Sequence, residues 1–312
     1  MSKYQKSVSF FERLFFKPNI LDWVIIFLLS PLSLLYAFIM FLRRVFTIKK
    51  SYSVPIVSIG NLTVGGSGKT PFIIALASRY DNVTVISRGY GRQSRGLIEV
   101  SSKGQILTDV FNSGDEPMLI ANSLKNASVI VSENRETAIN LALSRGANVI
   151  FLDDGFNRVA IKKFEILLFP KTVKNYMPFP AGPFREFYFS KVFSDLNLYE
   201  ELDFKRKVSF KNETEKMFLV TAISNPERLK PFLVNYNIVG DCFLEDHAYF
   251  DESLLAEKML SLGATSLLVT EKDKVKMQDF QLHLSVMQLE LQIKSNVLKK
   301  IDTYIGEYKY ER

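Results

Sequence analysis

The strongest hydrophobic pattern in the chain is a run of 19 residues without a charge, from Val24 to Leu42. A helix rises about 1.5 Å per residue, so this run would come close to spanning the roughly 30 Å hydrocarbon core of a bilayer. Trp23 precedes the run, and Arg43 and Arg44 follow it, as aromatic and basic residues do at membrane interfaces. We predict an N-terminal membrane helix, with a buried core helix as the alternative.

Beyond residue 51, short apolar and β-branched runs alternate with segments of helical length. Buried parallel strands are predicted at 54–59, 83–87, 127–131 and 149–152. Helices are expected between them at 71–80, 116–124 and 134–145. This alternation predicts an α/β fold with a doubly wound sheet.

A second, smaller α/β unit is predicted after a charged stretch. Its strands are expected at 217–222, 236–242 and 266–270, with a helix at 252–262. Before it, residues 171–189 are rich in proline and aromatic residues, which predicts an irregular functional loop. The expected parts are a membrane anchor, a nucleotide-binding domain, a linker and a C-terminal domain, at residues 1–50, 51–203, 204–216 and 217–312.

The composition narrows the class of partner. A formal net charge of +7 favours an anionic partner, which includes nucleic acid, anionic lipid and phosphorylated substrates. Nucleic acid is disfavoured because the basic residues are spread along the chain without a stacking motif. One cysteine, Cys242, excludes an intramolecular disulfide, and with only two histidines a Cys/His zinc site is not expected.

The clearest chemical motif is a glycine-rich loop between the strand ending at Ile59 and the helix expected from Pro71. The loop reads Gly65-Gly66-Ser67-Gly68-Lys69-Thr70. In such a loop backbone N–H groups hold phosphate oxygens, Lys69 reaches the β- and γ-phosphates, and Thr70 binds Mg²⁺. The strict P-loop pattern would need glycine at position 63, where this chain has threonine. The alternative is a glycine-rich turn with an incidental lysine.

Carboxylates supply two further candidate elements. Asp153 and Asp154 follow the predicted strand 149–152, at the end of the sheet where ligands bind, and either can hold Mg²⁺ as a Walker B aspartate does. Asp115 and Glu116 begin a predicted helix, where they would be favourable to the helix dipole. Alternatively, one of them faces the γ-phosphate and helps an attacking hydroxyl lose its proton, and Glu116 is a further candidate Mg²⁺ ligand.

Taken together, these motifs resemble the tetraacyldisaccharide 4'-kinase family of lipid A biosynthesis over most of the chain. The resemblance is carried, in chain order, by an N-terminal membrane helix and the segments Pro55–Asn61, Gly65–Pro71, Ser87–Arg92, Gly114–Pro117, Asp153–Phe156, Pro180–Glu186, Asp246-His247 and Thr270–Asp273.

The resemblance implies an ATP-dependent kinase that phosphorylates the 4'-hydroxyl of a tetraacylated glucosamine disaccharide 1-phosphate. It also implies a P-loop NTPase-like fold of two α/β/α domains joined by a two-stranded linker. By matching positions, Asp115 and His247 would form an inter-domain pair that activates the sugar hydroxyl, and Arg185 would place positive charge beside the transferred phosphoryl group. Without the resemblance, His247 would be read as a structural histidine.

The expected location is the bacterial inner membrane, with the catalytic domains facing the cytoplasm, where ATP is available. The expected partners are the lipid substrate, ATP with Mg²⁺ and membrane lipids, with no nucleic acid and no obligate protein partner. The chain departs from the family at Asn157-Arg158, where Gln-His is usual. The rival hypothesis is a membrane-tethered P-loop NTPase or nucleotide-binding regulator that does not phosphorylate lipid.

Overall fold

The computed structural model describes the chain from residue 3 to residue 309, except residues 66 and 67. These residues form two compact units. The first unit comprises the chain up to Ile73, Leu143–Lys205 and the chain from Ile293, and the second comprises Ile74–Ala142 and Arg206–Gln292. The predicted domain boundaries remain a prediction.

The first unit contains a run of parallel strands in the order β6-β1-β7-β8. The bounds are β1 Ile56–Gly60, β6 Val149–Asp153, β7 Phe164–Phe169 and β8 Leu196–Tyr199. Every residue of β1 and β6 is buried, as expected of parallel strands covered on both faces. Helix α9 (Ser295–Gly306) belongs to this unit: the Tyr304 ring stacks on Phe164 at 4.7 Å between centroids.

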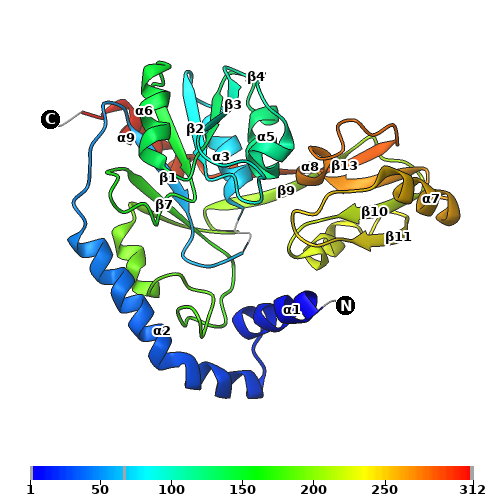
Figure 1. The fold of residues 1–312 in the computed structure, drawn as a ribbon, viewed down its shortest axis with the longest axis horizontal. Helices are drawn as coiled ribbons and strands as arrows, with labels where there is room; N and C mark the ends of the chain where they lie inside the picture. The colour runs from blue at the N-terminus through cyan, green and yellow to red at the C-terminus, as the bar shows by residue number, and fades with distance from the viewer. Residues whose placement is uncertain (1–2, 66–67, 310–312) are drawn as a thin grey trace. The chain divides into compact units, whose positions relative to one another are not determined.

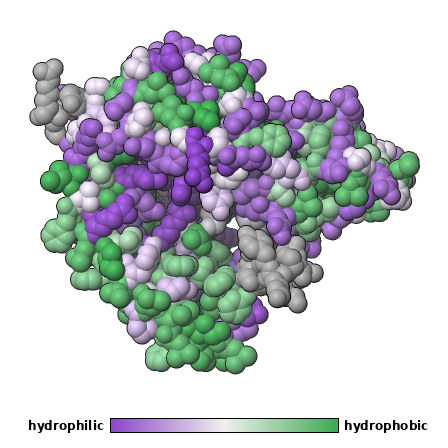
Figure 2. All heavy atoms as spheres, viewed as in Figure 1, coloured by the Kyte–Doolittle hydropathy of each residue, from purple (hydrophilic) through white to green (hydrophobic). Residues whose placement is uncertain are grey.

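Two N-terminal helices, α1 (Lys3–Phe16) and α2 (Ile20–Phe46), also belong to the first unit (Figure 1). The buried residues of α2 recur along one stripe, at Asp22, Ile26, Ser33, Ala37 and Arg44. The opposite face is strongly apolar and exposed, and Figure 2 shows hydrophobic residues gathered over this helix. By length and composition α2 is long and apolar enough to cross a membrane, and it continues as a helix through Pro31.

The irregular segment predicted at 171–189 packs against these helices. Asn175 donates a side-chain hydrogen bond to the Leu14 carbonyl oxygen at 3.2 Å, and Ser33 Oγ accepts one from the Ala181 N–H at 2.8 Å. Leu14, Phe15, Ile26 and Ala181 form a small apolar core. The segment ends in a short 3₁₀ helix, η1 (Tyr188–Phe193).

The second unit begins with the strand run β4-β3-β5-β2, in which β2 and β5 are parallel and β3 is antiparallel to β5. The bounds are β2 Val83–Ser87, β3 Ile98–Ser102, β4 Gln105–Ile106 and β5 Ser128–Val131. The neighbouring helices are α3 Lys69–Ala77, α4 Val110–Ser113, α5 Asp115–Ser123 and α6 Arg135–Ser144. Of these, α3 begins in the first unit and α6 ends there.

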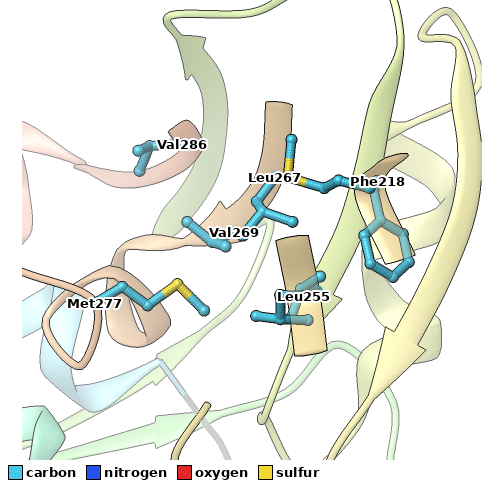
Figure 3. Close-up of a cluster of buried hydrophobic side chains, with 8 residues drawn as sticks. Phe218, Leu255, Leu267, Val269, Met277 and Val286 are labelled. Atoms are coloured by element: carbon cyan, nitrogen blue, oxygen red, sulfur yellow. The ribbon is translucent and has the colours of Figure 1, made fainter. Parts of the chain in front are cut away.

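A five-stranded sheet completes the second unit, in the order β11-β10-β12-β13-β9. The bounds are β9 Phe204–Lys211, β10 Met217–Thr221, β11 Ile238–Phe243, β12 Ser266–Thr270 and β13 Leu284–Ile293, with α7 Glu252–Leu262, α8 Glu271–Lys274 and the 3₁₀ helix η2 Pro226–Phe232. One face of the sheet forms the core shown in Figure 3, where Met277, just after α8, packs with Leu255, Val269 and Phe218. This core fixes the chain around α8.

The predicted α/β fold class with a large parallel sheet is confirmed. The strands predicted at 54–59, 83–87, 127–131 and 149–152 and the three helices expected between them are present, and none of their ends is shifted by more than three residues. The elements that were not predicted are strands β3, β4, β7, β8, β9 and β13 and helices α1, α4, α8 and α9. The predicted linker at 204–216 contains β9, which lies at the edge of the five-stranded sheet.

Candidate active site

The glycine-rich loop lies where the motif requires it, between β1 and α3. Gly65 and Gly68 have φ of +95° and +81°, which L side chains rarely adopt, and α3 begins at Lys69. The first turn of α3, with Lys69 and Thr70, therefore follows Gly68 directly. Gly66 and Ser67, predicted to bind phosphate, lie outside the described residues.

Arg185 is held beside this loop by backbone pairing. The Arg185 N–H donates to the Leu62 carbonyl oxygen at 2.8 Å, and the Val64 N–H donates to the Pro183 carbonyl oxygen at 2.8 Å. These bonds join the proline- and aromatic-rich segment to the chain that enters the glycine loop. Two motifs about 120 residues apart in the sequence therefore lie side by side in the first unit.

Asp154 links the charged side chains of this site. Its Oδ2 accepts a hydrogen bond from Arg185 Nη1 at 2.7 Å, and its Oδ1 lies 3.8 Å from Lys69 Nζ. Lys69 also donates to Asn61 Oδ1 at 3.0 Å. The ammonium thus contacts the carboxylate of the predicted Walker B pair rather than an unrelated acid, and its side chain keeps 15% exposure.

The turn after β6 packs closely on β1. A Cβ on Gly155 would lie 2.6 Å from Ser58 Oγ, so the turn requires glycine at this position. Asp153 ends β6 and is buried, whereas Asp154 has a φ of +53° and points toward the two cations. Among the described residues, no group of three or more His, Cys, Asp or Glu side chains is arranged to hold a metal ion.

Asp115 and His247 meet within the second unit. His247 Nδ1 lies 2.9 Å from Asp115 Oδ1 and 3.0 Å from Oδ2. Asp115 begins α5 and its side chain is 3% exposed, while His247 follows β11 with a φ of +65° and is 17% exposed. The distances place the ring nitrogen in a hydrogen bond with the carboxylate, over 132 residues of sequence.

The surroundings of Asp115 favour its ionised form. Burial alone would raise the pKa of this carboxyl, but the hydrogen bond with His247 and the charges of Lys272, His247 and Lys276 outweigh it, so the pKa lies below its usual value. Asp115 is therefore a carboxylate at neutral pH. Glu116 follows it on α5, and its Oε1 lies 3.6 Å from Lys272 Nζ.

Sequence reasoning missed three side chains that contact these predicted site residues. Asn61 binds Lys69, Lys272 binds the acids around Asp115, and Arg44 contacts the backbone of Phe156 beside the Asp153–Gly155 turn. Asn61 and Lys272 stand inside motifs quoted for the family resemblance, which was the available signal. Arg44 was read only as a charge flanking a membrane helix.

At Asn157-Arg158, where the chain departs from the family, the backbone carbonyl oxygens accept hydrogen bonds from basic side chains. The Asn157 carbonyl oxygen accepts a hydrogen bond from Arg43 Nη2 at 2.7 Å, and the Arg158 carbonyl oxygen accepts one from Lys163 Nζ at 2.8 Å. These contacts use no side-chain atom of either residue, so they hold the turn independently of the side chains that differ from the family.

A glycine loop at a strand-to-helix junction, with a lysine beside strand-end carboxylates, defines the class of P-loop phosphotransferases. Comparison with known proteins agrees with this class. The model of the tetraacyldisaccharide-1-P 4'-kinase family, LpxK, matches residues 25–306, and the chain belongs to this family. It is accordingly an ATP-dependent lipid A 4'-kinase. The predicted enzyme class is confirmed, and the rival hypothesis of a nucleotide-binding regulator is not supported.

Relatives match almost the whole chain. The tetraacyldisaccharide 4'-kinase of Helicobacter acinonychis is 48% identical over 303 residues, which cover 96% of each chain. That of Aliarcobacter butzleri is 43% identical over 98% of this chain and 99% of its own. The crystal structure of an "apo" form of LpxK from Aquifex aeolicus in complex with ATP is similar with a TM-score of 0.75 and 27% identity, covering 90% of this chain and 99% of that one.

Proposed function

We propose that this chain binds ATP with Mg²⁺ at the loop from Gly65 to Thr70 and transfers the γ-phosphoryl group to the 4'-hydroxyl of a tetraacylated glucosamine disaccharide 1-phosphate. The observation that carries this proposal is the convergence of Lys69 and Arg185 on Asp154 at the start of α3. Two cations at the end of a glycine loop are suited to the β- and γ-phosphates. The Aquifex aeolicus relative, whose structure contains ATP, supports the choice of nucleotide.

Charge neutralisation is the main contribution of these cations. Phosphoryl transfer passes through a loose transition state, so positioning and electrostatics dominate over covalent chemistry. The bond between the γ-phosphorus and the bridging oxygen breaks and its electron pair leaves with ADP, while the 4'-oxygen forms the new bond to phosphorus. Lys69 and Arg185 offset the negative charge on the phosphoryl oxygens.

The Asp115–His247 pair is proposed to take the proton of the attacking hydroxyl. With its Nδ1–H donated to Asp115, a neutral imidazole keeps a lone pair on Nε2 that can accept a proton, and the carboxylate then stabilises the imidazolium. The ionised state of Asp115 suits this role.

Mg²⁺ is proposed to be held by Thr70 and the carboxylates that follow β6, with Glu116 as a further candidate. Mg²⁺ commonly takes one or two carboxylates together with substrate phosphates, and Thr70 and Asp153 offer hard oxygen ligands of that kind. Asp154 already contacts two cations, so Asp153 is the stronger candidate of the two aspartates. When bound, Mg²⁺ would neutralise charge on the phosphates.

We further propose that α2 lies along the inner face of the bacterial inner membrane. Its exposed apolar face suits lipid, whereas its buried stripe binds other parts of the same chain, through Ser33 and Arg44 for example. A spanning orientation would carry the irregular segment around Ala181 to the depth of Ser33, where exposed backbone is costly. A helix partly immersed on its apolar face avoids that cost and leaves the catalytic units in the cytoplasm.

Variants of the acid–imidazole pair test the proposed mechanism. Asp115→Asn and His247→Asn should each lower kcat by about 10²–10⁴-fold, the usual contribution of general base catalysis, with KM for ATP close to that of the parent. His283→Gln serves as the matched control because that histidine is exposed and lies in an unrelated loop. A variant of the pair with near-normal kcat would remove that residue from the mechanism.

A further inference from the structure

Lys272 stands at the centre of the acids that surround the Asp115–His247 pair. Its Nζ lies 3.2 Å from Asp246 Oδ1, 3.5 Å from Asp115 Oδ2 and 3.6 Å from Glu116 Oε1. These acids come from two separate segments, the start of α5 and the loop after β11. The side chain of Lys272 is only 18% exposed, so one ammonium joins the two segments that carry the pair.

The residues on either side of Lys272 fix its position. Thr270 caps α8 by accepting from the Asp273 N–H, and Glu271 accepts from Gln288 Nε2 at 2.7 Å. Asp273 is fully buried and accepts from Thr221 Oγ1 at 2.6 Å and from the Ala222 N–H at 3.0 Å.

Ala222 connects the buried Asp273 to His247 through two backbone hydrogen bonds. Its carbonyl oxygen accepts a hydrogen bond from the His247 N–H at 3.2 Å, while its own N–H is bound by Asp273. The helix that carries Lys272 and the loop that carries His247 are therefore fastened to the same residue at the end of β10. Movement of one relative to the other would break buried hydrogen bonds.

Lys276 supports the same carboxylate from one turn further on. Its side chain is 1% exposed, donates to the Ala248 carbonyl oxygen at 3.0 Å, and lies 3.8 Å from Asp115 Oδ2. Lys276 is also 3.6 Å from Asp273, so its charge is shared with a structural acid. Lys272, in contrast, forms its ion pairs with acids of the two segments that carry the Asp115–His247 pair.

The local charge excludes a direct phosphate-binding role for Lys272. Three carboxylates lie within 4 Å of its ammonium, which leaves no excess positive charge to attract a phosphate. Those acids also raise the pKa of Lys272, although burial by itself would lower it. The Lys272 ammonium therefore stays charged and attracts the carboxylates of Asp115 and Asp246.

We propose that Lys272 is a positioning residue for phosphoryl transfer, which holds Asp115 and the Asp246-His247 segment together so that His247 keeps its hydrogen bond to Asp115. This inference rests on the proposed role of the pair. It assigns a function to the lysine of the Thr270–Asp273 motif. The other three residues of the motif are structural: Thr270 caps α8, Glu271 accepts a hydrogen bond from β13, and Asp273 is buried and binds residues at the end of β10.

Loss of the ammonium should lower the rate of phosphoryl transfer. Lys272→Met should lower kcat by about 10²-fold, as misplacement of a catalytic group by about 1 Å can do, with an unchanged KM for ATP.

Three variants serve as controls. Lys272→Arg should restore most of the rate because it retains the charge. Lys274→Met, on the same helix but exposed, should behave as the parent. Asp246→Asn combined with Lys272→Met removes one charge of each sign, so it should fold as the parent does and still show the lower kcat.

The state of the imidazole can be read directly. His247 and His283 are the only histidines in the chain, so ¹⁵N NMR of the detergent-solubilised protein shows two imidazoles, which His283→Gln identifies. Lys272→Met should abolish the fixed Nδ1–H form of His247. A parent-like His247 imidazole in Lys272→Met would overturn the inference.

A double-mutant comparison separates this inference from the proposed function. If Lys272 acts through Asp115, Lys272→Met should have no further effect on kcat in the Asp115→Asn background. Full activity of Asp115→Asn would instead contradict the proposed function of the pair. An inactive Asp115→Asn together with a fully active Lys272→Met would leave the pair in place and refute only the role of Lys272.

Discussion

Neighbouring residues of identical chemistry have different environments at this site. Asp153 is 4% exposed at the end of β6, whereas the side chain of Asp154 is 35% exposed and contacts both Arg185 and Lys69. The left-handed backbone of Asp154 turns its side chain away from the strand direction, and aspartate tolerates this conformation better than most residues. The two carboxylates are therefore suited to different tasks.

We expect the two aspartates to respond differently to amide substitution. Asp153→Asn should raise the Mg²⁺ concentration needed for half-maximal activity by at least about tenfold, because an amide would replace the proposed charged ligand of the metal. Asp154→Asn should leave that concentration nearly unchanged and lower kcat, since Lys69 and Arg185 lose their shared anion. Mg²⁺ titration of initial rates measures both, and the reverse pattern would assign the metal to Asp154.

The sequence identified single residues as candidates for the site but did not predict the contacts between them. Lys69, Asp154 and Arg185 were each recognised in a motif. Their meeting depends on the backbone bonds that join Leu62 to Arg185 and Val64 to Pro183, within a segment that has no regular periodicity. Asn61 and Lys272 were missed because their contacts arise only after the strands and helices are packed.

The carboxyl end of α2 is joined to two loops of the active site. Arg44 forms a bidentate pair with Glu186, with Nη2 to Oε1 at 2.6 Å and Nε to Oε2 at 2.8 Å, and also donates to the Phe156 carbonyl oxygen at 3.0 Å. Its guanidinium lies 3.7 Å from the Phe156 ring centroid. Glu186 follows Arg185, so the helix end, the turn after β6 and the arginine segment form one connected element.

Removal of this arginine should destabilise the first unit. Arg44→Met would leave Glu186 buried without its cation, which typically costs about 3–5 kcal/mol, and thermal unfolding should show a lower Tm. Arg43→Met is the matched control because Arg43 is adjacent but exposed, and it should change Tm little. Replacing both partners, in Arg44→Met with Glu186→Leu, should recover much of the loss. An unchanged Tm in Arg44→Met would show that the pair contributes no stability.

Most short, buried apolar runs were predicted as strands, although β7 (FEILLF) was missed. Strands β1, β2, β5 and β6 are short buried runs, and each was recognised. The sequence predicts a charged linker at strand β9 because charged residues are frequent in FKRKVSFK, where exposed lysines at positions 205, 207 and 211 alternate with more buried side chains. Such alternation is common in edge strands, where exposed charges prevent further strand pairing.

The N-terminal helices are packed against the rest of the first unit. The sequence suggests a separable anchor, but α1 and α2 form an apolar core with Ala181, and Arg44 is bound to the active-site loops. Deleting the first 45 residues would therefore expose this core and remove Arg44. Membrane binding is better tested by changing only the exposed face of α2.

Polar substitutions on that face should release the protein from lipid without loss of fold. We expect a variant with Leu21, Phe27, Leu28 and Leu35 changed to serine to stay soluble in flotation with phosphatidylethanolamine–phosphatidylglycerol vesicles, while the parent floats. The control changes four exposed apolar residues elsewhere to serine, namely Leu202, Val234, Leu254 and Leu260. Equal flotation of the α2 variant and the parent would point to another membrane-binding surface.

The most direct test of the account is phosphoryl transfer by the purified full-length chain in detergent. Incubation with [γ-³²P]ATP, Mg²⁺ and the tetraacylated disaccharide 1-phosphate should give a labelled lipid that carries the new phosphate at the 4' position. Lys69→Ala should reduce this label by at least about 10²-fold, because the cation at the β- and γ-phosphates is lost. ATP turnover without a labelled lipid, or full labelling by Lys69→Ala, would contradict the proposed site.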